Sequence, residues 1–520
     1  MSSKPAAAPA TAPATGAPSF TPAYRSAVLG LLVIAYTFNF IDRTIINTIG
    51  QAIKEDLQLT DTQLGWLTGL AFALLYTTLG IPIARLADRY NRVNIISIAI
   101  VIWCGFTALC GTATTYLQLL LYRVGVGVGE AGLTPPAHSL ISDYYEPQKR
   151  ASALSIYSFG IPLGAGFGAV AGGWIAQEVS WQAAFMIVGA PGILIAIAIK
   201  LFVKEPPRGW ADRQLADAKA QGASSPQAAV GDETPGALGR EASEAGAPND
   251  AAKPASMLAV AKRLFGSWGM FHMAAGITVA SFAGYGTGAY AAPYFIREFG
   301  LGLALVGLAT GVIAMVSNGA GTLLGGFLTD WASKRSARWY ALVPGIGLIL
   351  ATPLYILAYT RDDYQLAWAI LLIPGILHYT YLGPTLGVVQ NVMDIRMRAT
   401  AVALLWFVLN LIALGFGPPF CGWCIDQFAR AAFAAKGMAG EFIASCPGGT
   451  APKGSDPALA EACKSAMAEG TRAGLVSNLL IYAWAGAHYL LAAITLPKDM
   501  AKARAEADAG DAAAAARAAS

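Results

Sequence analysis

The sequence predicts an all-α membrane protein with twelve transmembrane helices in two six-helix halves. The chain of 520 residues is 55% hydrophobic and 13% charged, whereas about a quarter of the residues of a soluble domain are charged. Apolar stretches close to the roughly 20 residues that a helix needs to cross a bilayer recur along the chain. A polar segment separates them into two groups of six. We therefore expect a multi-pass protein of the plasma (inner) membrane.

The predicted N-terminal half covers residues 24–204. Residues 1–23 are rich in Ala, Pro, Thr and Ser, a composition that cannot bury enough surface to fold, so we expect a disordered tail. The first apolar run, from about Ala27 to Gly50, has the length of a full span and lacks a cleavage site, which predicts an uncleaved insertion signal. The other apolar stretches of this half are 61–86, 93–113, 116–144, 151–177 and 182–203.

The C-terminal half is predicted at 257–497, after a linker at 205–256 that is dominated by Ala, Gly, Pro, Asp and Glu. A long polar loop at 429–472 interrupts this half before its last span, and residues 498–520 form a second tail. The apolar stretches of this half are 268–296, 302–330, 338–359, 365–391, 399–427 and 474–496.

Basic residues predict that both termini and the linker are cytoplasmic, because cytoplasmic loops carry an excess of Lys and Arg. The short loops on the opposite side hold three bases, Lys54, Arg297 and Arg361. The loop at 429–472 is then on the outer, oxidising side, where Cys446 and Cys463 are expected to form a local disulfide. The alternative is a disordered insertion.

Several function classes are excluded by composition and motifs. The net charge of +4 is small, and the charged residues are distributed by side of the membrane and not gathered in one patch. Both observations argue against nucleic acid as a partner. Cys421 and Cys424 have the spacing of a redox motif, but their apolar surroundings indicate packing. Neither a zinc-ligand spacing, nor a phosphate-binding P-loop, nor a nucleophile beside a base in a polar setting is found. We expect no enzyme activity, no catalytic residue, no metal and no cofactor.

An acid and a base, Asp42 and Arg43, lie inside the first apolar run. Each such charge costs about 2.5–3.5 kcal/mol at the centre of a membrane helix, so an ionisable residue at this depth is a functional-site hypothesis by default. The alternative is that both side chains reach the interface near the end of the helix. Against it, about seven positions, or roughly 10 Å of helix, separate Arg43 from Gly50.

Similar charged loops follow the second span of each half, at 85–92 and 325–335. Two six-helix halves with a polar linker resemble the parallel repeats of a major facilitator transporter. The loops look like that family's signature, glycine-small-leucine-alanine-aspartate-arginine-x-glycine-arginine, although Ala84 and Asn91 replace glycines in the first copy. The resemblance implies a cytoplasmic latch between the halves; the alternative is that these bases only fix the topology. The latch residues would be Asp88, Arg89, Arg92, Asp330 and Arg335.

Further motifs narrow the resemblance. Arg123-x-x-x-Gly127-x-Gly129-Glu130 is similar to the superfamily's arginine-glycine motif. Asp42-Arg43-Thr44, Gly129-Glu130-Ala131-Gly132 and the segment from Tyr285 to Tyr290 look like the spinster family. This resemblance implies an alternating-access carrier, and its animal members transport sphingosine phosphate or lysophospholipids.

Glu130 lies about halfway through the stretch 116–144, so it is a second carboxylate near the membrane midplane. The resemblance places it beside Arg43 in a central cavity. Desolvation raises a carboxylate's pKa and a nearby guanidinium lowers it, so a carboxylate whose neighbours change can load and release a proton. Asp42 and Glu130 are therefore the predicted proton carriers, and Arg43 is their mobile counter-charge. The alternative is a permanent ion pair that only holds two helices together.

The remaining candidates concern the substrate. Arg123, two turns before Glu130, could bind an anionic headgroup or could be satisfied by helix-end carbonyls. The residues His378, Tyr285, Tyr290 and Trp406 could line the path of an acyl chain or could serve packing alone. We expect a monomer among membrane lipids that carries a lysolipid or sphingosine-phosphate-like amphiphile coupled to protons. The alternative is a proton-coupled carrier of a small organic anion such as a sugar acid.

Overall fold

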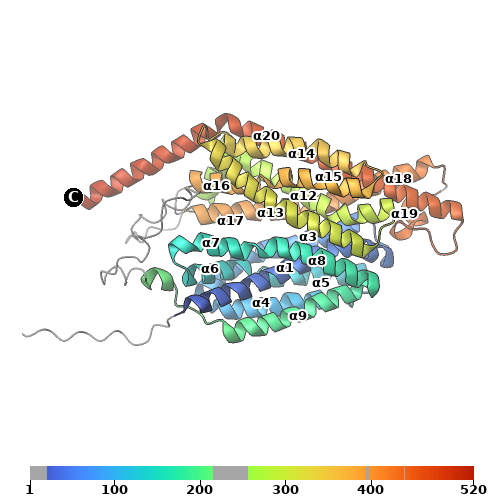
Figure 1. The fold of residues 1–520 in the computed structure, drawn as a ribbon, viewed down its shortest axis with the longest axis horizontal. Helices are drawn as coiled ribbons and strands as arrows, with labels where there is room; N and C mark the ends of the chain where they lie inside the picture. The colour runs from blue at the N-terminus through green and yellow to red at the C-terminus, as the bar shows by residue number, and fades with distance from the viewer. Residues whose placement is uncertain (1–19, 215–255, 394–396, 439, 520) are drawn as a thin grey trace, which may run out of the picture.

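The computed structural model describes residues 20–214, 256–393, 397–438 and 440–519. Within these ranges every regular element is helical, so the predicted all-α class is confirmed. Figure 1 shows two helical bundles that lie side by side with their long axes parallel. The predicted tail at 1–23 and the predicted linker at 205–256 lie largely outside the described residues.

The N-terminal half contains nine helices that build six passes. Its helices are α1 (Pro22–Asp56), α2 (Asp61–Thr68), α3 (Leu70–Arg89), α4 (Arg92–Cys110), α5 (Tyr116–Glu130), α6 (Thr134–Tyr144), α7 (Pro147–Ser158), α8 (Gly160–Glu178) and α9 (Trp181–Phe202). Three passes are interrupted, between α2 and α3, between α5 and α6, and between α7 and α8. Glu130 is the last residue of α5, just before the prolines at the start of α6, which lack the N–H that a continuing helix would use.

The C-terminal half is built in the same way. Its elements are α11 (Met257–Phe265), α12 (Trp268–Phe299), α13 (Leu303–Ser333), α14 (Trp339–Tyr359), α15 (Tyr364–Tyr379), α16 (Leu382–Val392), α17 (Arg398–Leu409), the π-helical turn η1 (Asn410–Leu414), α18 (Gly415–Ala435), α19 (Phe442–Ser445), the 3₁₀ turn η2 (Pro447–Gly449) and α20 (Pro457–Ala519). α18 and α20 extend far into the predicted loop at 429–472, so its irregular part is shorter than expected. α20 also continues through the predicted tail at 498–520.

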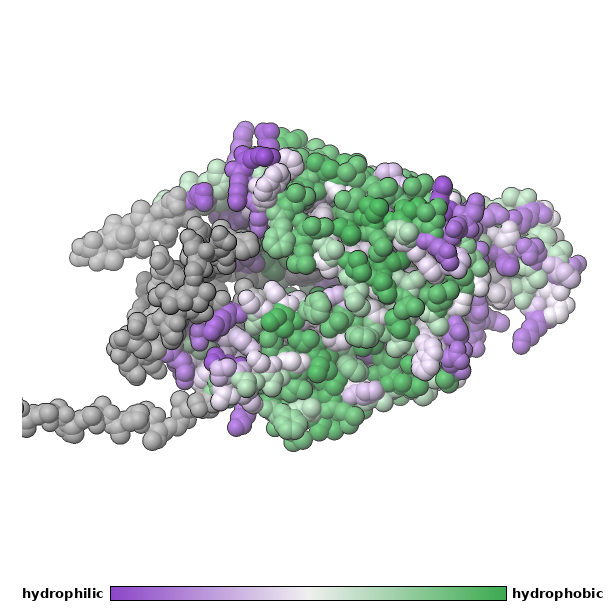
Figure 2. All heavy atoms as spheres, in the orientation of Figure 1, coloured by the Kyte–Doolittle hydropathy of each residue, from purple (hydrophilic) through white to green (hydrophobic). Residues whose placement is uncertain are grey.

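The outer surface is that of a membrane protein. Ten of the helical passes among the described residues are long and apolar enough to span a bilayer. The two other predicted passes are the interrupted pair α5–α6 and the 32-residue α12, which is rich in Gly, Ala and Tyr. Figure 2 shows an apolar belt around the middle of the molecule with polar residues gathered at its two ends. Large apolar side chains such as Leu194 and Leu201 of α9 are about 70% exposed, as a lipid-facing surface requires.

The two ends of the bundle differ. The disulfide end carries Cys446 and Cys463, and the terminal end is where α1 begins and α20 ends (Figure 1). At the disulfide end the halves are in backbone contact, because a Cβ on Gly65 of α2 would lie only 2.6 Å from the carbonyl oxygen of Pro418 in α18. Toward the terminal end the halves are parted by a hollow (Figure 2).

Candidate functional site

An ion pair joins α1 to α5 in the middle of the N-terminal half. Arg43 donates from Nη2 and Nε to the same oxygen, Oε2 of Glu130, at 2.7 and 3.2 Å. Nη2 also lies 3.4 Å from Oδ1 of Asn39, one turn earlier on α1. The Glu130 side chain is fully buried, whereas that of Arg43 is 12% exposed. The structure thus brings together the two residues that the sequence analysis paired.

A second acid and base complete a buried group of four charges. Arg123 is fully buried on α5, and its Nη1 donates to the backbone oxygen of Asp42 at 3.2 Å. The carboxylate of Asp42, also fully buried, lies beside Thr107 and Trp103 without reaching hydrogen-bond geometry. Among the described residues, neither carboxylate oxygen of Asp42 has a hydrogen-bond partner. Buried polar atoms rarely lack a hydrogen-bond partner. This group of four charged side chains is therefore unusual for a core with a purely structural role.

Aromatic rings surround the Arg43 guanidinium. Its Cζ lies 4.8 Å from the ring centre of Phe40, 4.7 Å from that of Phe72 and 4.5 Å from that of Tyr76. Such cation–π contacts stabilise a charge that has left water, by about 2 kcal/mol when desolvated. Tyr285 of α12, in the other half, is close enough to Arg43 for an electrostatic interaction between the two side chains. Its ring packs against the hydrophobic cores of both halves. Arg43 is therefore placed where the two halves meet.

A second charged cluster, which the sequence analysis missed, joins the halves at the disulfide end. Asp61 of α2 binds Lys54 of α1 at 2.6 Å and Arg297 of α12 at 2.6 Å. Arg297 Nε also donates to Gln51 Oε1 at 2.7 Å. All four side chains are at least nine-tenths buried. The sequence analysis counted Lys54 and Arg297 only as bases of the outer loops. Because bases are rare in those loops, their presence there was the signal in the sequence that could have pointed to this cluster.

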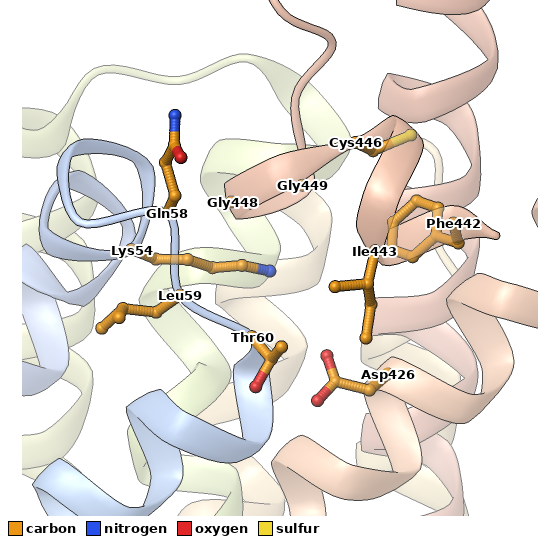
Figure 3. Close-up of a pocket in the computed structure, with 10 residues that line it drawn as sticks. All are labelled: Lys54, Gln58, Leu59, Thr60, Asp426, Phe442, Ile443, Cys446, Gly448 and Gly449. Carbon is orange, nitrogen blue, oxygen red and sulfur yellow. The ribbon is translucent and has the colours of Figure 1, made fainter. Parts of the chain in front are cut away.

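The start of α2 is capped by a residue of the opposite half. Asp426 of α18 accepts hydrogen bonds from the backbone N–H groups of Asp61 (2.9 Å) and Thr62 (2.8 Å), and from the Thr62 hydroxyl (2.6 Å). Figure 3 shows Asp426 pointing from α18 toward this corner of α2, beside Thr60. A carboxylate at a helix N-terminus is favoured by the helix dipole. Charge and capping thus hold the disulfide end closed.

The comparisons with known proteins fit this architecture. Residues 32–418, more than half of the chain, match the Major Facilitator Superfamily. The chain belongs to this superfamily. A crystal structure of a bacterial homologue of the human lysosomal transporter spinster, inward-facing and unoccupied, matches with a TM-score of 0.77 and 33% identity, over 92% of this chain and 99% of that one.

Two curated relatives are also similar to this major facilitator protein. An MFS-type efflux pump of Mycolicibacterium smegmatis is 30% identical over 77% of this chain and 84% of its own. A hexuronate transporter of Bacillus subtilis is 24% identical over 79% of this chain and 91% of its own. The match to the spinster structure confirms the resemblance read from the motifs. Of the two relatives, one is named for a substrate, hexuronate, and the other only as an efflux pump.

Three of the predicted substrate residues have their contacts at other places in the protein. Tyr290 is fully buried at the disulfide end, where its hydroxyl donates to the backbone oxygen of Asp61. His378 is buried inside the C-terminal half, with its Nδ1 3.4 Å from the Tyr355 hydroxyl. Trp406 is half-buried against the core of that half. Of the predicted substrate residues, Arg123 and Tyr285 are brought to Arg43 in the charged group.

The predicted latch residues are not joined across the halves in this structure. Asp88 and Arg89 are exposed at the terminal end, and no ion pair among the described residues includes either. Arg92 is fully buried and binds Asp143 of the N-terminal half at 2.5 Å and Glu205, the first residue of the predicted linker, at 2.6 Å.

The second copy of the charged loop is likewise unpaired across the halves. The Arg335 guanidinium lies over the ring of Trp331, 4.7 Å from its centre, and no ion pair among the described residues includes Arg335 or the partly buried Asp330. A latch made by these loops would therefore form only in a state in which the terminal end is closed.

Proposed function

We propose that this protein is a proton-coupled carrier of a single-chain anionic or zwitterionic amphiphile, such as a lysolipid or a sphingosine-phosphate-like lipid. The observation that carries the proposal is the Arg43 guanidinium, which is held by Glu130 on one edge and by aromatic rings on its face. Its partial exposure leaves donors free for a headgroup, and guanidinium donors suit phosphate and carboxylate oxygens. The partly buried rings of Phe40 and Tyr76 offer apolar surface to the chain that follows the headgroup, with the fully buried Phe72 behind them.

Proton coupling follows from competition for Arg43. A headgroup anion that draws Arg43 toward itself leaves Glu130 buried without its counter-charge. A buried carboxylate without a counter-charge is far more stable when it binds a proton. Asp42 already lacks a direct ion pair among the described residues and lies beside this site, so it is the second proton-carrying group. Substrate binding and proton binding are linked through one guanidinium.

Alternating access follows from the difference between the two ends. Loops rich in Lys and Arg lie at the terminal end, so this end and both termini face the cytoplasm in the proposal. The protein is then inward-facing here, closed by the Asp61 cluster and by the Asp426 cap. Its similarity to an inward-facing spinster homologue supports this orientation. We propose a monomer, since each chain contains both halves of the transport path.

A sugar acid is the second candidate substrate, favoured by the similarity to a hexuronate transporter. Arg43 could bind its carboxylate equally well. The sugar hydroxyls, however, need several convergent polar groups. Apart from Glu130 and Asn39, the neighbours of Arg43 named above are aromatic: Phe40, Phe72, Tyr76 and Tyr285. These surroundings favour an amphiphile.

The test is transport by purified protein in liposomes under an imposed pH gradient. Labelled lysophospholipid, sphingosine phosphate and a hexuronate are offered separately, with protein-free liposomes as the control. We expect movement of at least one lipid that stops when the gradient is dissipated. Movement of the hexuronate with no movement of either lipid would reverse the ranking of the two substrates.

A further inference from the structure

The segment 441–456, which we name the strap, belongs to the C-terminal half but reaches the N-terminal half. It includes α19 and η2 and connects α18 to α20. A Cβ on Gly448 would lie 3.1 Å from the backbone oxygen of Lys54 and 3.2 Å from Cα of Gln58. Gly448 also has a φ of +67°, a conformation that favours glycine. The strap backbone is therefore seated directly on the last turn of α1 (Figure 3).

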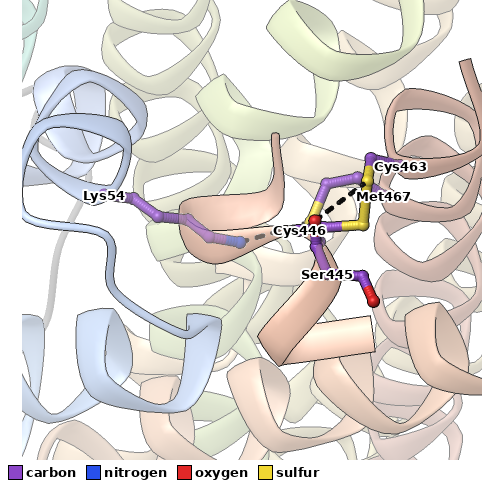
Figure 4. The surroundings of a disulfide bond; sticks show 5 residues. All are labelled: Lys54, Ser445, Cys446, Cys463 and Met467. Carbon is purple, nitrogen blue, oxygen red and sulfur yellow. Dashed lines mark hydrogen bonds between the residues drawn. A yellow bond between two sulfur atoms is a disulfide. The ribbon is translucent and has the colours of Figure 1, made fainter. Parts of the chain in front are cut away.

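A disulfide anchors the strap to the helix that completes this contact. Cys446 and Cys463 are joined, with their Cα atoms 5.7 Å apart, and both are buried. Met467, one turn after Cys463 on α20, has its sulfur 3.3 Å from the Lys54 ammonium. Figure 4 shows Lys54 extending from the N-terminal half toward this disulfide. Strap, disulfide and α20 thus cover the outer side of Lys54, which is only 1% exposed.

Covering Lys54 protects the cluster that closes the disulfide end. The bonds from Lys54 and Arg297 to Asp61 are strong only while water is excluded, because attraction between charges falls as the local dielectric rises. The bridge Cys446–Cys463 restricts the strap to a closed loop with a sequence separation of 17 residues. With the bridge broken, the strap keeps its contact with α1 only through weaker packing.

We propose that the disulfide-anchored strap is a redox-sensitive latch that holds the disulfide end closed and so biases the carrier toward the state open at the terminal end. Its release is a two-electron exchange with a dithiol: the S–S bond of Cys446 and Cys463 breaks, each sulfur gains a proton, and the dithiol becomes a cyclic disulfide. The inference rests on the alternating access proposed above, but it is independent of the identity of the substrate and of proton coupling.

Hydrogen exchange of the purified protein in detergent tests the latch. The reporter is the peptide segment 57–64, because the amides of Asp61 and Thr62 are bonded to Asp426 across the halves. Oxidised protein is compared with dithiol-treated protein, whose reduction is verified by intact mass, and with a Cys446→Ser/Cys463→Ser variant. We expect exchange in this segment to rise roughly tenfold or more on loss of the bridge. Dithiol added to the double variant should change nothing further.

Two glycine substitutions separate the latch from a general effect of disulfide loss. Gly448→Ala keeps the disulfide but crowds the strap against the backbone at the end of α1, which loosens this contact. Gly454→Ala imposes a similar left-handed strain (φ +84°) where a Cβ meets nothing within 4 Å. We expect Gly448→Ala to raise exchange at 57–64 and Gly454→Ala to leave it unchanged. The latch is overturned if reduced protein stays within about twofold of oxidised protein in this segment. Equal effects of the two glycine variants overturn it as well.

Discussion

Replacing Arg43 with alanine removes the only cation that binds Glu130 among the described residues. Two hydrogen bonds to Oε2 of Glu130 and contacts with three aromatic rings disappear together. Removing one partner of a buried pair costs about 3–5 kcal/mol. Arg43 is 12% exposed, so the lower value applies. About 3 kcal/mol corresponds to roughly a hundredfold change in the equilibrium between folded and unfolded protein. Because the guanidinium is also the proposed headgroup site, we expect the initial rate of lipid transport by Arg43→Ala to fall to near background.

The assay is initial-rate transport in liposomes, with protein quantity and monodispersity matched between variants. Arg25→Ala is the control on the same helix, because Arg25 pairs with the partly exposed Glu146 at 3.9 Å and exposed pairs contribute about 0–1 kcal/mol. We expect its rate to stay within a few-fold of the parent. Arg43→Lys should be intermediate, since it keeps the charge but loses the planar fork.

One result would refute the mobile counter-charge. If Arg43 only neutralises Glu130 in a permanent pair, the double variant Arg43→Ala/Glu130→Ala removes both charges and regains transport. If Arg43 must move between Glu130 and a headgroup, the double variant stays as inactive as Arg43→Ala. The interaction energy from the full double-mutant cycle distinguishes the two cases.

Three further predictions follow from the same structure. Asp42→Asn and Glu130→Gln should fold but lose the pH dependence of transport, and undiminished proton-driven transport by both variants would contradict the proton assignment. Asp61→Asn should leave two buried cations without their shared partner and open the disulfide end; label distances between α2 and α18 should lengthen, and unchanged distances would argue against this gate. Intact mass without reductant should show Cys446 and Cys463 joined, and two free thiols would rule the bridge out.

The membrane fold could be predicted from the sequence because the bilayer fixes the length and polarity of each span. A helix inside the bilayer must hydrogen-bond its own backbone polar groups and present apolar side chains to the lipid. Each span therefore shows in the sequence as one continuous apolar run. The same cost made Asp42, Arg43 and Glu130 visible as candidates, since a charge at membrane depth needs a partner. The pairing of Arg43 with Glu130 was implied by the family resemblance, and the structure joins the two residues.

The sequence by itself determined the helical class, the two halves and the mid-membrane charges, and the tertiary structure decided which residues meet across the halves. Tyr285 and Tyr290 belong to one motif and are five positions apart on α12, yet they reach different sites. Tyr285 lies near Arg43, whereas the Tyr290 hydroxyl binds the backbone oxygen of Asp61. Asp426 caps α2 from 365 positions away, and Lys54 lies against a strap from the opposite half. Such contacts depend on how two bundles rotate and tilt against each other, and no local pattern of hydropathy records that geometry.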